Sequence, residues 1–147
     1  MSFEVSPVEI WVGELEDRPG ALASTLAQIM MCGGANLEFL VVRPSPEHPG
    51  RSIVYLAPLS TPEQQQAATQ VGLHRAERMF ALRLIGGDRP GLFAGLAGTL
   101  AQADVNIVGV SAAAANGVAI SYLRFESQQS ADAAARLLRP MLCDAPR

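Results

Sequence analysis

The sequence predicts an α+β fold made of two tandem units, each with the element order βαββαβ, an antiparallel sheet and helices on one face of that sheet. The tetrapeptide Asp-Arg-Pro-Gly stands at residues 17–20 and recurs at 88–91, a period of 71. Each copy follows an apolar strand pattern and opens an Ala/Leu-rich helix pattern. A whole supersecondary unit is therefore repeated, and the expected units are residues 1–77 and 78–147.

The first copy contains a complete set of element signals. Apolar and other residues alternate at positions 8–13, which predicts a strand. Pro19 suits the first turn of the next helix, because its missing N–H would be unpaired there. Gly33 and Gly34 end that helix, whose apolar face comprises Leu22, Leu26, Ile29 and Met30. The remaining expected elements are strands at 36–43 and 51–57, a helix from Thr61 to about Gly72, and a closing strand over 73–78.

The second copy repeats this order. Asn116-Gly117 predicts a tight hairpin turn, because both residues tolerate a positive φ. Only Cys143 to Arg147 follow the last helix, which is short for a closing strand. The second unit either lacks that strand or borrows residues 3–5 for it. The expected elements are strands at 79–85, about 106–114 and 118–126, and helices at 90–103 and from Ser130. This βαββαβ order is the plan of ferredoxin-like folds.

Composition narrows the possible functions. The chain has 147 residues, 49% of them hydrophobic and 17% charged, with a net charge of −3. So few charges predict exposed apolar surface and partner chains, while the acidic balance and scarce aromatics argue against nucleic-acid binding. All 11 basic residues are Arg, which excludes lysine-dependent catalysis. With two cysteines, no leader pattern and no membrane-length apolar run, we expect a soluble cytoplasmic protein.

The chemistry gathers at the loop after the first strand of each copy. A helix N-terminus offers unpaired N–H groups and a partial positive charge, which suit a carboxylate. The glycine of the motif allows close approach, the aspartate can accept from an ammonium group, and an asparagine at the next strand can both donate and accept. Together these groups describe a site for an α-amino acid. They are supplied by Gly20 and Gly91, Asp17 and Asp88, and Asn36 and Asn106.

In these motifs the sequence resembles the ACT domain. The second copy, residues 87–92 and 104–107, is very similar to the family pattern, whereas in the first copy Asn36 lies one residue further from its glycine. The resemblance implies regulatory binding of amino acids where ACT units pair. It implies ligand contacts at Asp88, Arg89, Gly91, Leu92, Phe93 and Asn106 in the second copy, and at Asp17, Gly20, Ala21, Leu22 and Asn36 in the first.

We expect the second copy to be the better site. Its spacing matches the family, and Glu14 and Glu16 add negative charge beside the first copy, which opposes a ligand carboxylate. Those two glutamates could alternatively bind a cation, although a solvated strand end is the preferred interpretation. His48 and His74 have no neighbours at ligand spacing, so no metal site is expected, and Trp11 is expected to serve packing or an interface.

Two functions remain open at this point. The first is a sensor that binds an amino acid at the Asp-Arg-Pro-Gly loops and modulates a partner, for which a metabolic enzyme or a regulator is the expected class. The alternative is a protein–protein interaction or oligomerisation module whose loops stay empty. A homodimer is expected in either case. No activated nucleophile or acid–base pair is visible, so we expect no enzyme activity, no catalytic residue and no cofactor.

Overall fold

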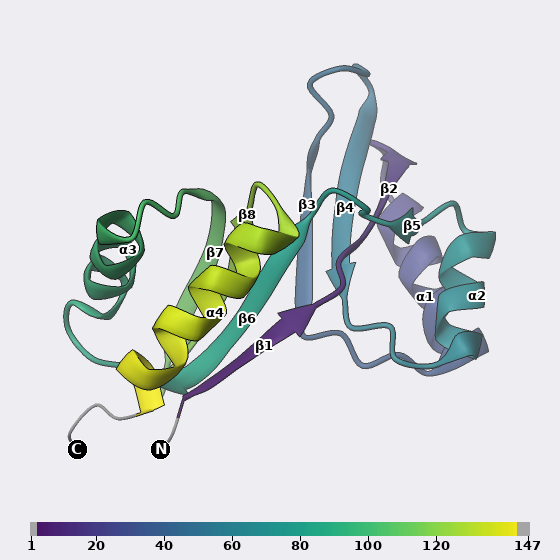
Figure 1. Cartoon of the computed structure of the whole chain (residues 1–147). Helices are drawn as coiled ribbons and strands as arrows, with labels where there is room; N and C mark the ends of the chain where they lie inside the picture. Colours follow the sequence, from purple (N-terminus) through teal and green to yellow (C-terminus); the bar gives the residue numbers. More distant parts are fainter. Residues whose placement is uncertain (1–2, 144–147) are drawn as a thin grey trace. The chain divides into compact units, whose positions relative to one another are not determined.

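The computed structural model describes residues 3–143, which form two compact units (Figure 1). The first unit is residues 9–76, and the second is the chain from residue 77 onward together with the N-terminal strand. The expected boundary after residue 77 lies one residue from the observed one, but the strand before residue 9 belongs to the second unit. The first unit is thus inserted between the first strand of the second unit and the rest of it.

The first unit has the expected βαββαβ order. Its four strands form one antiparallel sheet in the order β3-β4-β2-β5. The closing strand β5 has only two residues, fewer than the six that the sequence suggested. The elements are β2 (Trp11–Glu16), α1 (Ala21–Gly33), β3 (Phe39–Pro44), β4 (Arg51–Ala57), α2 (Pro62–Gln70) and β5 (His74–Arg75).

Alternating burial along β2 builds the core of this unit. Trp11 and Leu15 are buried against the two helices, while Val12 and Glu14 lie on the other face of the sheet. The predicted strand over 8–13 was wrong, because its alternation spans two strands: β1 ends at Val8 and β2 begins at Trp11. Period-2 patterning cannot show that the chain leaves one sheet and enters another. The packing interpretation of Trp11 is confirmed.

The helices of the first unit are ended and capped by local signals. Gly34 adopts φ 63° and donates its N–H to the Met30 carbonyl at 2.9 Å, so the predicted stop of α1 is confirmed. Met30 itself is 56% exposed, which corrects its assignment to the apolar core face. Helix α2 begins with a capping box in which Thr61 and Gln64 satisfy each other's backbone N–H groups.

The second unit forms an antiparallel sheet in the order β1-β6-β8-β7. The predicted hairpin turn is confirmed, since Asn116 and Gly117 have φ 52° and 78°. Helix α4 begins at Gln128, two residues before the predicted Ser130, because the Ser127 hydroxyl caps it. The elements are β1 (Glu4–Val8), β6 (Phe80–Gly87), α3 (Leu92–Gln102), β7 (Ile107–Ala115), β8 (Val118–Phe125) and α4 (Gln128–Cys143).

The N-terminal strand occupies the place of a closing strand in the second unit. Strand β1 pairs antiparallel with β6, Val5 opposite Leu84, along the edge shown in Figure 1. Both Nε and Nη2 of Arg139 on α4 donate to the Val5 carbonyl at 3.3 Å. The Phe3 ring lies over Gly86, where a Cβ would come within 2.3 Å of it. Of the two alternatives, the borrowed N-terminal strand is therefore the one observed.

Each unit buries its apolar residues on the helix-bearing side of its sheet. In the second unit, Leu84 on β6, Phe125 on β8, Leu100 on α3 and Leu138 on α4 are at most 1% exposed and belong to one cluster. In the first, Val54 and Leu56 on β4 pack with residues of α1 and α2. The α+β fold with antiparallel sheets is confirmed. Within residues 3–143, no helix is both long and apolar enough to span a membrane.

Candidate ligand site at the Asp-Arg-Pro-Gly turns

The two tetrapeptides adopt the same turn. In the first copy the Ala21 N–H donates to the Arg18 carbonyl at 3.3 Å, and in the second the Leu92 N–H donates to the Arg89 carbonyl at 3.2 Å. This i to i+3 bond closes a β-turn directly before each helix. The Leu92 N–H, which the sequence suggested as a carboxylate donor, is thus already engaged in the turn.

Glycine is required in each turn by backbone conformation. Gly20 has φ 89° and ψ −16°, and Gly91 has φ 78° and ψ 5°, the values of the third position of a type II turn. A Cβ at either glycine would meet nothing within 4 Å, so the constraint is φ and not space. Pro19 and Pro90 fill the preceding turn position, which corrects the placement of Pro19 in the first turn of the helix.

The aspartates lie at equivalent places beside a hairpin. The Asp17 N–H donates to the Gly50 carbonyl at 3.0 Å, and the Asp88 N–H donates to the Gly117 carbonyl at 2.9 Å. Each accepting glycine precedes the strand that pairs with the strand leading into the turn. One backbone hydrogen bond therefore ties each turn to the hairpin of its own unit.

The helices that follow the turns have no side-chain cap. Their N-caps are glycines, and neither α1 nor α3 has an acidic residue in its first turn. Helices α2 and α4 are capped instead by the hydroxyls of Thr61 and Ser127. Helix geometry leaves the first N–H groups of α1 and α3 without an intrahelical acceptor, among them those of Leu22 and Phe93. Both helices thus keep the partial positive charge that attracts an anion.

The charged side chains of the two turns differ in their contacts. Arg18 forms a short ion pair with Glu16. Among residues 3–143, no ion pair or hydrogen bond engages the Arg89 guanidinium or the carboxylates of Asp17 and Asp88, all of which are exposed. The second copy therefore offers a cation and a carboxylate that are both uncommitted, whereas the first offers only the carboxylate.

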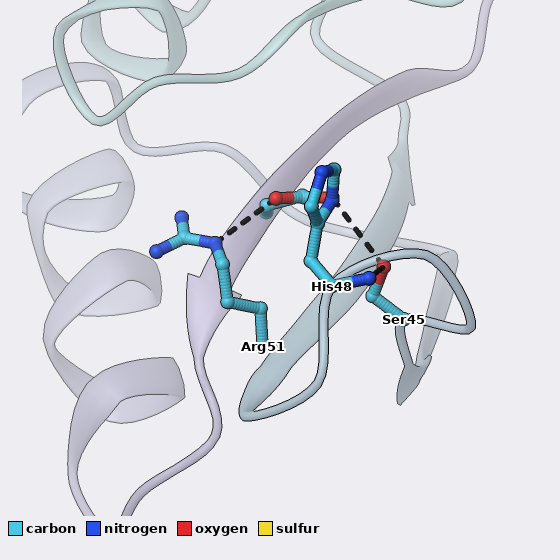
Figure 2. Close-up of polar contacts among 4 residues, drawn as sticks. Ser45, His48 and Arg51 are labelled. Atoms are coloured by element: carbon cyan, nitrogen blue, oxygen red, sulfur yellow. Dashed lines mark hydrogen bonds and ion pairs between the residues drawn. The ribbon is translucent and has the colours of Figure 1, made fainter.

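Glu14 is the centre of a polar network beside the first turn, and its partners Ser45, His48 and Arg51 are labelled in Figure 2. Its Oε1 lies 2.8 Å from His48 Nδ1 and accepts from the Ser45 hydroxyl at 3.4 Å, while its Oε2 accepts from Arg51 Nε at 2.9 Å. These three partners come from the β3–β4 hairpin, and Glu14 comes from β2. The sequence predicted that Glu14 lies at a solvated strand end. Its side chain instead binds loop residues that lie 31 and 34 positions later in the chain.

This network corrects an argument about charge. The hydrogen bond with His48 lowers the pKa of Glu14, with Arg51 contributing further. The hydrogen bond and charge of Arg18 lower the pKa of Glu16. Both carboxylates have cationic or hydrogen-bonding partners that offset part of their charge, so they would oppose a ligand carboxylate less than the sequence suggested. Within the described chain no cluster of three or more metal-ligating side chains occurs.

Asn106 lies at the opposite end of the sheet from Asp88. Gly87, which precedes Asp88, pairs with Val118, whereas Ile107, which follows Asn106, pairs with Phe125. These partners are seven positions apart on β8, which at about 3.4 Å per residue is a distance of roughly 20 Å or more. The Asn106 side chain instead donates to Glu126 at 3.2 Å. The structure does not bring Asn106 to the turn of its own unit.

Asn36 is separated from Asp17 in the same way. Asn36 precedes β3, and the first residue of β3, Phe39, pairs with Ala57 at the end of β4. Asp17 follows Glu16, which pairs with Arg51 at the start of β4. The two residues therefore lie at opposite ends of β4.

The remaining predicted residues serve structure as well as the turn. Leu92 is 3% exposed and Leu22 packs against the core of its unit, whereas Phe93 is 36% exposed at the surface.

Comparison with known proteins establishes the fold. No family model matches the chain, and no curated protein matches it. Protein BT0572 from Bacteroides thetaiotaomicron aligns with a TM-score of 0.74 and 16% identity over 90% of this chain and 88% of its own. The regulatory subunit of aspartate kinase from Thermus thermophilus aligns with a TM-score of 0.61 and 16% identity over 94% and 95%. The α+β fold is thus shared with a protein named as a regulatory subunit of aspartate kinase.

A larger protein contains a similar fold in one part of its chain. Aspartate kinase from Clostridium acetobutylicum aligns with a TM-score of 0.59 and 11% identity over 97% of this chain but only 34% of the kinase. The matched part is therefore about a third of that enzyme. At 11% to 16% sequence identity, these similarities show a shared fold.

Proposed function

We propose that this chain is a regulatory protein of two tandem ACT-like units that binds an amino acid at its Asp-Arg-Pro-Gly turns and modulates a partner. One observation carries the proposal: in both units an exposed aspartate directly follows a strand and precedes a helix N-terminus that has no side-chain cap, and its carboxylate has no partner among the described residues. An acceptor for an ammonium group and a donor array for a carboxylate are thus placed on either side of one tight turn.

The second copy is the stronger candidate. A ligand carboxylate would accept from the free N–H groups at the start of α3, such as that of Phe93, where the helix dipole favours an anion. The Asp88 carboxylate would accept from the ammonium group. Arg89 is exposed and unpaired within the described residues, so its guanidinium can bind the carboxylate as well. Asn106 is too far along the sheet to join this site in its own unit.

Regulation, not catalysis, is the activity that this site supports. Neither turn combines a nucleophile with a general base, and binding through N–H groups and an aspartate requires no cofactor. The architectural likeness to a regulatory subunit of aspartate kinase supports a role in control of a partner. We place that partner among metabolic enzymes or regulators of the cytoplasm, and the proposed ligand remains an α-amino acid without further definition.

The second candidate function, an interaction module, is favoured by exposed apolar residues at equivalent sheet edges. Strands β3 and β7 are edge strands of their sheets. Leu40 and Val42 on β3 are 43% and 39% exposed, and Val108 and Val110 on β7 are 41% and 59% exposed. Edge strands with apolar side chains are suited to pairing with another chain. We propose a homodimer, which light scattering on a sizing column tests directly; a monomer at micromolar concentration would contradict it.

A thermal-shift screen against the twenty amino acids tests the sensor function. A ligand that binds only the folded state raises the apparent stability by mass action. We expect one amino acid, or a chemically related few, to raise the melting temperature in a concentration-dependent manner. If the protein is a stable dimer and none of the twenty shifts its melting temperature, the interaction module becomes the better description.

A further inference from the structure

The hairpins that hold the two turns differ in length. In the first unit β3 ends at Pro44 and β4 begins at Arg51, which leaves a connection of residues 45–50. In the second unit β7 ends at Ala115 and β8 begins at Val118, so only Asn116 and Gly117 connect them. A two-residue turn with positive φ at both positions is fixed by its own backbone, whereas a longer loop needs additional contacts to hold it.

Glu14 supplies those contacts for the longer loop. Both of its carboxylate oxygens are engaged by side chains from the start, middle and end of the hairpin: Ser45, His48 and Arg51 (Figure 2). The loop backbone closes around the same residues, since the Ser45 N–H donates to the Arg51 carbonyl at 2.9 Å. The Arg51 N–H in turn donates to the His48 carbonyl at 3.1 Å. The loop is thus folded onto the Glu14 carboxylate of β2.

The held loop contains the acceptor for the first turn. Gly50, at φ 83°, presents the carbonyl that accepts the Asp17 N–H at 3.0 Å. In the second unit Ile85 stands three residues before Asp88, as Glu14 stands three before Asp17. The second turn therefore receives its hairpin hydrogen bond without any carboxylate at this position. The Glu14 network compensates for the longer hairpin of the first unit.

We propose that Glu14 is a positioning residue for the first Asp-Arg-Pro-Gly turn: by binding Ser45, His48 and Arg51 it keeps the Gly50 carbonyl in place to accept the Asp17 N–H. The consequence for a ligand at Asp17 rests on the proposed function, whereas the positioning of the turn does not. The role is specific to the first unit, so the two turns respond differently to loss of this one carboxylate.

Amide hydrogen exchange measured by NMR on the full chain tests this role. Glu14→Gln keeps the size of the side chain and removes its charge. Because exposed ion pairs are individually weak, we expect exchange at the Asp17 amide to rise roughly threefold to tenfold. The Asp88 amide, which makes the equivalent bond in the second unit, should be unchanged, and so should the Val54 amide in the first core. His48→Ala should act in the same direction, and Arg51→Lys, which keeps the cation, should retain most of the protection.

Glu9→Gln is the matched control. It removes the same charge from the same unit, but Glu9 pairs with Arg75 at 3.6 Å, away from the hairpin, so exchange at Asp17 should not change. Unchanged Asp17 exchange in Glu14→Gln would overturn the proposal, and so would an equal rise at Asp17 and Val54, which would mean general destabilisation. If Asp17 exchange rises but an amino acid found in the screen binds both copies as before, the positioning stands and the proposed use of the first site fails.

Discussion

Asp17 and Asp88 hold the same structural position, each with its amide bonded to a glycine carbonyl of the neighbouring hairpin, at 3.0 and 2.9 Å. The backbone around them is equivalent, but the side chains are not: Arg18 is paired with Glu16, and Arg89 remains unpaired among the described residues. The repeat has therefore kept the geometry of the turn while its charge environment has diverged. Differences in binding between the two copies should arise from that divergence.

Asp88→Ala should weaken binding of a responsive amino acid about 10- to 100-fold, because a hydrogen bond to a charged group is worth about 1.5–3 kcal/mol. Asp17→Ala should have the smaller effect. Calorimetric titration of both variants beside the unaltered protein measures this. The fold should persist in both, since substitutions in exposed loops away from the core usually cost little.

The outcome of that titration also ranks the two sites. If Asp17→Ala alone abolishes binding, the preference for the second copy is wrong. If neither substitution affects an amino acid that does bind, the aspartates serve only their turns.

Arg89→Ala should reduce affinity more than Arg18→Ala does. The Arg89 guanidinium is uncommitted, whereas Arg18 would have to leave Glu16 before it could bind a carboxylate. Titration of a responsive amino acid against both variants, repeated at raised salt, gives the comparison. The salt dependence should be weaker in Arg89→Ala, because an exposed charge interaction that salt screens has been removed. Equal effects of the two substitutions would contradict the proposed preference for Arg89, and no effect of either would mean that neither cation contacts the ligand.

Gly86→Ala should destabilise the second unit by about 1–3 kcal/mol, the range for forcing extra volume into a packed site. The added Cβ would lie 2.3 Å from a ring carbon of Phe3, so the Phe3 ring or the strand that carries it must move. Urea unfolding followed by fluorescence and circular dichroism measures the loss.

The neighbouring residue provides the control for that experiment. A Cβ at Gly87 would meet nothing within 4 Å, and its φ is not in the left-handed region. Gly87→Ala should therefore stay within about 0.5 kcal/mol of the unaltered protein. A Gly86→Ala variant as stable as Gly87→Ala would mean that Phe3 does not anchor β1.

Local signals in the sequence predicted the elements well, but not contacts set by long-range register. Residues 51–57 and the Asn116-Gly117 turn were predicted correctly, because strand-favouring side chains and turn chemistry act over a few residues. The pairing of Val5 with Leu84 depends on which edge remains open after the second unit folds. No pattern within residues 1–8 shows which sheet the strand joins.

The same distinction between local signals and long-range register applies to the candidate site. The turn, its glycine and its aspartate were found from a four-residue motif. The separation of Asn106 from Asp88 follows from strand direction. Strands β6 and β7 both run antiparallel to β8, so they run parallel to each other and begin at the same end of the sheet. Asp88 follows the end of β6, whereas Asn106 precedes the start of β7, so the two residues lie at opposite ends. Applied to the predicted elements, that rule would have excluded Asn106 from the turn. The contact of Glu14 with His48 required the register of β2 on β4 as well.

Lowering the pH should selectively weaken the first unit. The folded-state pKa of Glu14 lies below its ordinary value of 4.5, chiefly because of the hydrogen bond with His48, and that of Glu16 is lowered by Arg18. A carboxylate with a depressed folded-state pKa contributes stability that is present above the unfolded-state pKa and is lost as the pH falls through the folded-state value.

The urea midpoint of the unaltered protein should therefore exceed that of Glu14→Gln between pH 5 and 7. The difference should shrink steadily below pH 4.5, where the carboxylate gains its proton and becomes as neutral as the glutamine. Glu9→Gln, whose carboxylate pairs only at 3.6 Å with Arg75, should show a smaller difference throughout. A gap between the unaltered protein and Glu14→Gln that persists undiminished to pH 3 would mean that the charge of Glu14 does not stabilise the hairpin.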